Sequence, residues 1–214
     1  MKIGIIGSGD VAKSLGAGLR GKGHEVLLGT SDPAKLATWA AGTGGAQTGS
    51  FAQAAAFGEV VILAVKGTAA IAAIKAAGPQ VLAGKAVIDA CNPIADAQPV
   101  NGVLQFFTGP NESLLESLQR EFPAVHFVKG YNSVGAAHMV DPQFAGGPPT
   151  MFIAGNNDAA KASVASLVRE TGWEVADMGR AEAARAIEPL CMLWCIPGML
   201  RNEWAHAFKL VKPA

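Results

Sequence analysis

The chain has 214 residues with 17 basic and 17 acidic side chains, so its formal net charge is zero. That balance argues against nucleic acid or an anionic membrane surface as a partner. Hydrophobic residues make up 50% of the chain and charged residues 16%, which predicts a sheet buried on both faces and a homodimer. No apolar run approaches the roughly 20 residues that cross a bilayer, and Met1-Lys2 leads directly into an apolar strand. A cytoplasmic protein is therefore expected.

Strand-like and helix-like segments alternate through the first 130 residues. Strands are expected at residues 2–6, 25–28, near 47, 59–65, 86–89 and 126–129. Helices are expected between them at residues 10–21, 33–42, from 50, 68–77 and 112–122. This order predicts parallel strands, because each helical crossover returns the chain to the same end of the sheet. The fold class is therefore α/β, with a Rossmann-type doubly wound parallel sheet.

The pattern changes after residue 130. Residues 141–149 are rich in Pro and Gly, which is typical of a linker. A strand at 150–154, a helix at 158–171 and a strand at 173–176 follow, and then a helix from 180 to about 211 that Pro189 and Pro197 interrupt. The chain is predicted to divide into a nucleotide-binding domain, residues 1–140, and a smaller C-terminal α+β domain, residues 150–214.

The turn after the first strand carries the sequence Gly7-Ser8-Gly9-Asp10-Val11-Ala12. Gly7 allows a sharp turn, Gly9 leaves room for a pyrophosphate beside the backbone, and Ala12 lets the helix lie close to the sheet. Free N–H groups and the helix dipole make the first turn of the helix an anion site. The position of the motif between a strand and a helix predicts a bound dinucleotide.

The end of the second strand indicates which dinucleotide. Where NAD-binding sites place an acidic residue, this chain has Gly29-Thr30-Ser31, with Lys35 one turn further on. Hydroxyl groups and a lysine suit a 2′-phosphate, so NADP is predicted. Asp32 leaves NAD open as the alternative, although its position suits a helix cap equally well.

Three cysteines are too few for a disulfide framework. Cys191 and Cys195 stand four residues apart and share a helix face, and Cys91 lies in an apolar segment. No histidine or further cysteine stands at metal-ligand spacing, so core packing is favoured over a metal or redox role. No metal site is predicted.

With these residues in view, the chain resembles the NADPH-dependent reductases of the deazaflavin coenzyme F420, the deazaflavin:NADP oxidoreductases. The likeness covers nearly the whole chain. It rests on the opening glycine motif and on these blocks: Gly23–Val26, Asp89–Pro93, Val128–Ala136, Asp141-Pro142, Ile153–Asn156, Ile187–Leu190 and Ala207–Leu210.

The resemblance implies a set of cofactor contacts. It maps the phosphate loop onto Ser8, Gly9, Asp10 and Val11, and the 2′-phosphate site onto Thr30, Ser31 and Lys35. Ser31 stands where the family commonly has an arginine, which removes a bidentate phosphate partner. Val65, Lys66, Asn92, Pro93 and Ile94 correspond to segments beside the ribose and nicotinamide, and residues 134–137, with Ala136, to the segment that closes over the nicotinamide.

The resemblance further implies NADP(H) as cofactor and coenzyme F420, or a flavin, as the small-molecule redox acceptor. The acceptor would lie between the two domains, against residues 190–195. In this segment Met192 and Trp194 are bulky, and they would either pack as core residues or lie against a flat ring.

Hydride transfer between two flat rings needs no general acid, because positioning supplies most of the catalysis. No residue is therefore assigned a catalytic role; His138, beside the segment expected over the nicotinamide, is the candidate to test. Two other functions stay open. One is reduction of a small imine or 2-keto acid, and the other is a non-catalytic NADP(H) sensor. An open cleft beside the nicotinamide would favour a catalyst.

Overall fold

The computed structural model describes residues 1–44 and 46–213. Within these residues, eight strands form one sheet in the order β3-β2-β1-β4-β5-β6-β7-β8. All neighbours are parallel except β6 and β7. The strands are β1 (Lys2–Ile6), β2 (Glu25–Gly29), β3 (Gln47–Gly49), β4 (Val60–Leu63), β5 (Ala86–Asp89), β6 (His126–Lys129), β7 (Thr150–Gly155) and β8 (Glu174–Asp177).

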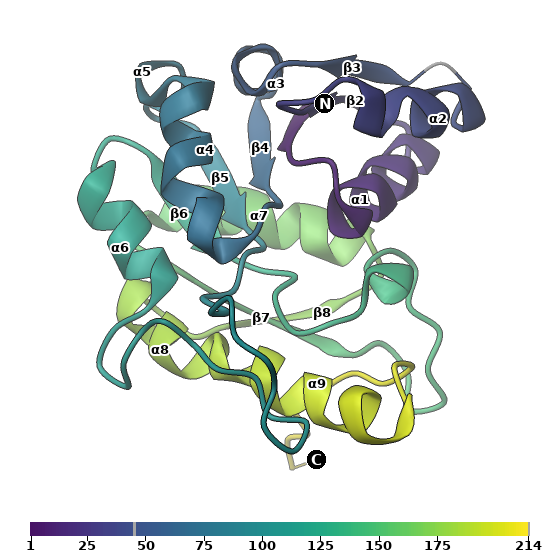
Figure 1. The fold of residues 1–214 in the computed structure, drawn as a ribbon, viewed down its shortest axis with the longest axis vertical. Coiled ribbons are helices and arrows are strands. Elements are labelled where there is room, and N and C mark those ends of the chain that lie inside the picture. The colour runs from purple at the N-terminus through teal and green to yellow at the C-terminus, as the bar shows by residue number, and fades with distance from the viewer. Residues whose placement is uncertain (45, 214) are drawn as a thin grey trace.

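Helices cover the sheet on both faces (Figure 1). The α-helices are α1 (Asp10–Gly21), α2 (Ala34–Gly42), α3 (Phe51–Phe57), α4 (Ala70–Ala77), α5 (Pro79–Leu82), α6 (Leu114–Glu121), α7 (Asp158–Glu170), α8 (Ala184–Ile187) and α9 (Pro189–Arg201). Short 3-10 helices are η1 (Gly67–Ala69), η2 (Ala136–His138) and η3 (Ala181–Ala183). In Figure 1, α1 and α2 lie on the right, α4 to α6 on the left, and α8 and α9 below.

Successive side chains of the central strands point to opposite faces of the sheet, which divides the hydrophobic core into two parts. In β4, Val60 and Ile62 belong to the core cluster that includes residues of α1, α2 and α7, whereas Val61 and Leu63 belong to the cluster that includes residues of α4 and α6. Successive strand residues point to opposite faces, so the continuous apolar run of β4 buries both of them. A third, small cluster joins α9 to the loop that follows β5.

The predicted α/β Rossmann class is confirmed. The two C-terminal strands continue the sheet, since β7 pairs with β6. The division into domains at residues 1–140 and 150–214 stays a prediction. The helices α5 and η2 were not expected.

The prediction of a helix to about residue 211 is wrong. Helix α9 ends at Arg201, and Asn202 takes a left-handed conformation with φ of 56°. Pro197 lies inside α9 without ending it. Phe208 and Leu210 lie beside the start of β7 instead: the Thr150 N–H donates to the Phe208 carbonyl at 2.9 Å, and the Leu210 N–H donates to Thr150 Oγ1 at 3.0 Å. Hydrogen bonds to a distant strand thus replace the helical ones.

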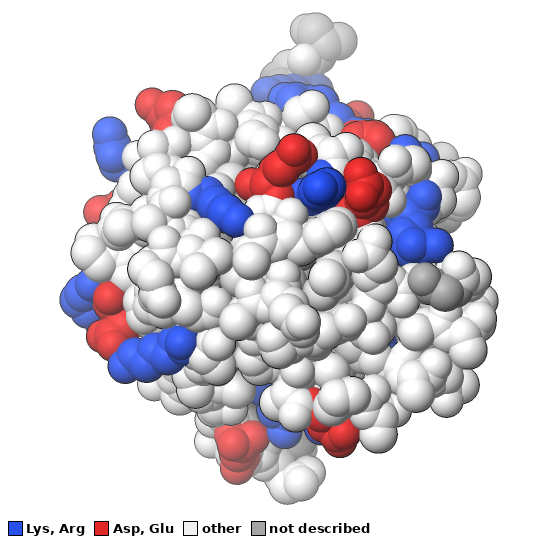
Figure 2. All heavy atoms as spheres, turned by 90° about the horizontal axis from the view of Figure 1, so that it is seen from above, with Lys and Arg blue, Asp and Glu red and all other residues white. Residues whose placement is uncertain are grey.

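One helical stretch within the described residues, Ala181–Arg201, has the length and apolar composition of a membrane span. That is weak evidence, because core helices share both properties. Cys191, Trp194, Cys195 and Gly198 of α9 are buried against the rest of the chain. The face of the molecule in Figure 2 shows acidic and basic side chains interspersed around an uncharged centre.

Candidate functional site

A cavity of about 910 Å³ opens beyond the carboxyl ends of β1 and β4. Doubly wound sheets bind ligands at this edge, where the strand order reverses. The strands β2 and β4 flank β1, so the reversal lies at this cavity. Its lining comprises Gly7–Val11, Ser31, Lys35, Phe51, Ala64–Lys66, Ala69, Ala72, Ala73, Ala76 and Ala90.

The glycine turn has two glycines with different functions. A Cβ on Gly7 would lie 2.1 Å from the Ala64 carbonyl oxygen, and the φ of Gly7 is 150°. A side chain there would disturb the fold. A Cβ on Gly9 would meet nothing within 4 Å, so this position borders open space. Gly9 is also the N-cap of α1 and makes no side-chain cap, which leaves the first N–H groups of the helix available to an anion.

The end of β2 offers Ser31 and Lys35 to the same cavity. Thr30 does not line it: this residue is buried, and its hydroxyl donates to the Asp32 carbonyl and accepts from the Asp32 N–H, both at 3.1 Å. The Asp32 carboxylate accepts the N–H of Ala34, the first residue of α2, at 3.1 Å. The groups at hand for a 2′-phosphate are therefore a hydroxyl and an ammonium.

A second cavity of about 640 Å³ adjoins the first. Val11, Val65, Lys66 and Ala90 line both. The remainder of its lining comes from the turn after β4 and from the loop after β5: Gly67, Cys91, Asn92 and Ile94–Gln98. Apolar side chains predominate. Two charged groups stand at its opening, Lys66 and Asp96, with Nζ and Oδ1 3.8 Å apart and both side chains exposed.

Most predicted cofactor positions come together at these cavities. Those lining one or both are Gly7, Ser8, Gly9, Asp10, Val11, Ser31, Lys35, Val65, Lys66, Asn92 and Ile94. Thr30, Pro93 and Ala136 line neither, and Ala136 borders a separate cavity beside α1. Contact of each residue with a cofactor stays a prediction.

His138 lies apart from both cavities. It belongs to η2 and packs against Phe144, with ring centroids 5.2 Å apart. Tyr131 is buried, and its hydroxyl bonds Thr171 Oγ1 at 2.7 Å. Burial raises the pKa of Tyr131 above its usual value, which keeps the phenol protonated.

Trp194 belongs to the small core cluster of α9 rather than to either cavity lining. Its indole N–H donates to the His206 carbonyl at 2.8 Å, and a Cβ on Gly135 would lie 3.0 Å from the indole ring. Cys191 and Cys195 are buried in the same cluster. Within residues 1–44 and 46–213, no group of three or more His, Cys, Asp or Glu side chains is arranged to hold a metal ion.

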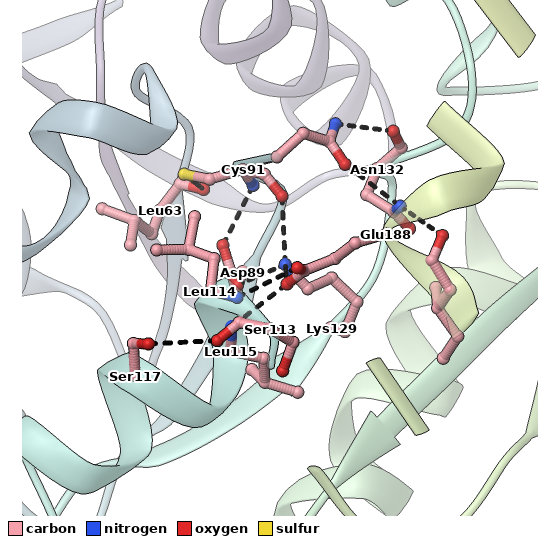
Figure 3. A network of polar contacts seen from close by, with 12 residues as sticks. Leu63, Asp89, Cys91, Ser113, Leu114, Leu115, Ser117, Lys129, Asn132 and Glu188 are labelled. Atoms are coloured by element: carbon pink, nitrogen blue, oxygen red, sulfur yellow. Dashed lines mark hydrogen bonds and ion pairs between the residues drawn. The ribbon is translucent and has the colours of Figure 1, made fainter. Parts of the chain in front are cut away.

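A buried ionic network lies beneath the second cavity (Figure 3). Lys129 Nζ approaches Asp89 Oδ2 at 2.6 Å and Glu188 Oε1 at 2.7 Å, and it donates to the Cys91 carbonyl at 3.0 Å. Burial alone would lower the pKa of Lys129, but the two carboxylates outweigh burial and raise that pKa above its usual value. The lysine is therefore charged. Burial, followed by the charge of Asp89, raises the pKa of the Cys91 thiol, which makes it a poor nucleophile.

Sequence reasoning missed three parts of this region: the alanines of α4, the loop residues 95–98 and the buried ionic network. The alanines of α4 that line the first cavity carry no chemical signal, and the loop residues 95–98 look like any polar loop. Asp89 and Lys129 could have been paired from sequence, because each ends a strand and the two strands are neighbours in register. Nothing in the sequence places Glu188 beside them.

Comparisons with known proteins agree with this geometry. Residues 2–93 match the family described as "NADP oxidoreductase coenzyme F420-dependent". The crystal structure of a "putative F420 dependent NADP-reductase" from Arthrobacter sp. FB24 is 35% identical, with a TM-score of 0.92 over 99% of this chain and 100% of that chain.

Two further proteins are similar over part of their length. Metalloreductase STEAP3 of Rattus norvegicus is 32% identical over 204 residues, which are 93% of this chain and 39% of that protein. A Streptomyces aurantiacus imine reductase has a TM-score of 0.70 at 17% identity, over 94% of this chain and 63% of the other; at that identity the likeness shows the fold alone. The full-length match at 35% identity decides the family. The chain belongs to the family of coenzyme F420-dependent NADP oxidoreductases and is an NADP-dependent oxidoreductase.

Proposed function

We propose that this protein transfers a hydride between NADP(H) and a deazaflavin- or flavin-like acceptor. The observation that carries the proposal is the second cavity, which adjoins the nucleotide cavity and is about 640 Å³ in volume. A dinucleotide stretched from Lys35 through Ser8–Val11 would bring its nicotinamide to the residues that both cavities share. The second cavity then leaves space for another ring beside it.

The chemistry of that space suits a flat heterocycle. Val11, Val65, Ala90 and Ile94 offer apolar surface for ring faces. Hydride transfer moves two electrons and one proton as a unit from the nicotinamide to the acceptor, so the protein need only exclude water and align the rings. A non-catalytic sensor has no need for this second space.

A small imine or keto acid that carries a carboxylate suits the cavity less well. Such a substrate calls for a cation beside the reacting carbon, ideally a bidentate arginine. Of the described residues that line the second cavity, Lys66 alone is basic, and it lies 3.8 Å from Asp96 at the exposed rim. The planar acceptor is therefore favoured.

The 2′-phosphate site gives a first prediction. Ser31→Arg adds a guanidinium to the lining beside Lys35, and a bidentate arginine–phosphate pair should raise NADPH affinity about tenfold, or about 1.4 kcal/mol. NADH affinity should be unchanged. Fluorescence titration with both nucleotides measures the ratio. An equal gain in NADH affinity would show that the 2′-phosphate does not bind beside residue 31.

His138 gives a second prediction. Because its ring packs on Phe144 and lines neither cavity, His138→Ala should lower turnover by less than about tenfold, whereas loss of a general acid typically costs about 100-fold or more. Steady-state rates at saturating NADPH decide between the two. A loss of several powers of ten would reveal proton chemistry at this residue.

The experiment that tests the proposal follows oxidation of NADPH by absorbance. The purified protein is offered deazaflavin, riboflavin derivatives, quinones, ferric chelates and a cyclic imine carboxylate in parallel. Reduction of a deazaflavin or flavin at least tenfold faster than of the imine supports the proposal. The proposal would be contradicted if the protein reduced the imine preferentially, or if it reduced none of the acceptors. A homodimer in the cytoplasm stays a prediction, which light scattering and fractionation would test.

A further inference from the structure

The turn Ala90–Asn92, which we call the 90–92 turn, follows β5 and lines the second cavity. It lies where the nicotinamide and its acceptor would meet under the proposed function. Cys91 is held at both of its backbone groups: its N–H donates to Asp89 Oδ1 at 3.0 Å, and its carbonyl accepts from Lys129 Nζ at 3.0 Å. Both Asp89 and Lys129 have no exposed surface.

Lys129 also reaches the C-terminal helices. Its ammonium approaches Glu188 Oε1 at 2.7 Å, and Glu188 is the N-cap residue of α9. Glu188 in turn accepts the N–H groups of Leu114 and Leu115, at 2.9 and 3.1 Å, at the start of α6. Two carboxylates therefore face one ammonium, and the first N–H groups of α6 offset the remaining negative charge.

A second route joins the same two places (Figure 3). Asn132 Nδ2 donates to Asn92 Oδ1 at 3.2 Å and to the Ile187 carbonyl at 3.0 Å. Asn92 Nδ2 donates back to the Asn132 carbonyl at 2.8 Å. The residues Ile187 and Glu188 at the junction of α8 and α9 are thus tied to Asn92 through Asn132 and to Cys91 through Lys129.

We propose that Lys129 is a positioning residue for hydride transfer, which holds the 90–92 turn in register with the start of α9. The inference rests on the proposed function, because it supposes that the two rings meet at this turn. A buried charge of this kind is not needed to grip the nucleotide, since the phosphate loop and Lys35 lie along the first cavity. Loss of Lys129 should therefore separate nucleotide binding from transfer.

The test uses two variants at the network and one matched control. Lys129→Met leaves two carboxylates unpaired and is the stronger change. Asp89→Asn is milder, because Lys129 keeps Glu188, but an amide must now turn a donor toward either the Cys91 N–H or the Lys129 ammonium. The control is Lys161→Met: Lys161 is also buried and approaches Asp177 at 3.0 Å and Asp158 at 3.3 Å, yet it lines neither cavity.

Four quantities are measured: melting temperature, NADPH dissociation constant, fluorescence of the bound nicotinamide, and single-turnover hydride transfer. For the two network variants we expect the NADPH dissociation constant to stay within about threefold of the parent's. The increase in nicotinamide fluorescence that accompanies binding should be lost, and hydride transfer should be about 100-fold slower, because misplaced reactants react more slowly. Lys161→Met should lower the melting temperature and change neither the nicotinamide fluorescence nor the rate of hydride transfer. Should Lys129→Met fail to fold, Asp89→Asn decides.

Unchanged emission and transfer in folded Asp89→Asn would overturn the inference, and so would an equal loss in Lys161→Met. The nicotinamide emission needs no acceptor. If the parent protein reduces no deazaflavin or flavin, the proposed function fails. The comparison of nicotinamide fluorescence between the variants then still tests whether Lys129 positions the bound nucleotide.

Discussion

Gly9→Val should abolish NADPH binding while the protein stays folded. The φ of Gly9 is −81°, which any residue adopts, and a Cβ there meets no atom within 4 Å. The added side chain would instead project toward the space that the diphosphate needs beside the first N–H groups of α1. We expect the dissociation constant to rise at least about 100-fold, or about 3 kcal/mol, measured by fluorescence titration, with an unchanged melting temperature.

Gly21→Val provides the matched control. Gly21 ends the same helix, and a Cβ there also meets no atom within 4 Å, but it lies at the opposite end from the cavity. This variant should bind NADPH like the parent. If Gly9→Val binds NADPH normally, the diphosphate does not lie on the first turn of α1.

Ala95→Trp should block hydride transfer and leave NADPH binding intact. Ala95 is half-buried in the loop after β5 and lines the second cavity alone. An indole there would occupy the space assigned to the acceptor ring. Because misplacement by about 1 Å can cost about 100-fold in rate, we expect at least that loss in single-turnover transfer, with the NADPH dissociation constant unchanged.

The control for this variant is Ala176→Trp, which adds the same indole at a half-buried position in β8 that lines neither cavity. Its transfer rate should match the parent's. Normal transfer in Ala95→Trp would show that the acceptor does not use the second cavity. A changed NADPH dissociation constant in Ala95→Trp would show that the two cavities are not separate in function.

The elements that sequence predicts best are those with a strong local pattern. The strand expected within 59–65 and found at Val60–Leu63 needs no tertiary knowledge, because a short apolar run without polar interruption suits a strand buried on both faces. The helix starting after Ser50 follows from a capping box, in which Ser50 and Gln53 exchange hydrogen bonds. The end of α9 could not be predicted from the apolar pattern, since the segment after it is held by tertiary contacts: Trp204 and His206 pack on Trp194, and Phe208 and Leu210 bond to Thr150.

The candidate site likewise has residues that the local sequence pattern predicts and residues that only tertiary packing brings into it. The glycine motif and the hydroxyls after β2 are close in sequence to the elements that position them, so most of the first cavity was predictable. Thr30 lies outside the cavity lining, and its hydroxyl closes a local turn with Asp32; spacing alone does not reveal that turn. The link from Lys129 to Glu188 spans 59 positions, and tertiary packing, in which α6 contacts both β6 and α8, brings the two residues together.

The most direct measurement is a crystal structure of the protein with NADP bound. We predict that the diphosphate lies on the backbone amides of Ser8–Val11 and the 2′-phosphate beside Ser31 and Lys35. The nicotinamide should lie between Val65 and Ala90, with one ring face toward the second cavity. A cofactor bound elsewhere, or a nicotinamide whose ring face is covered by protein, would contradict this prediction.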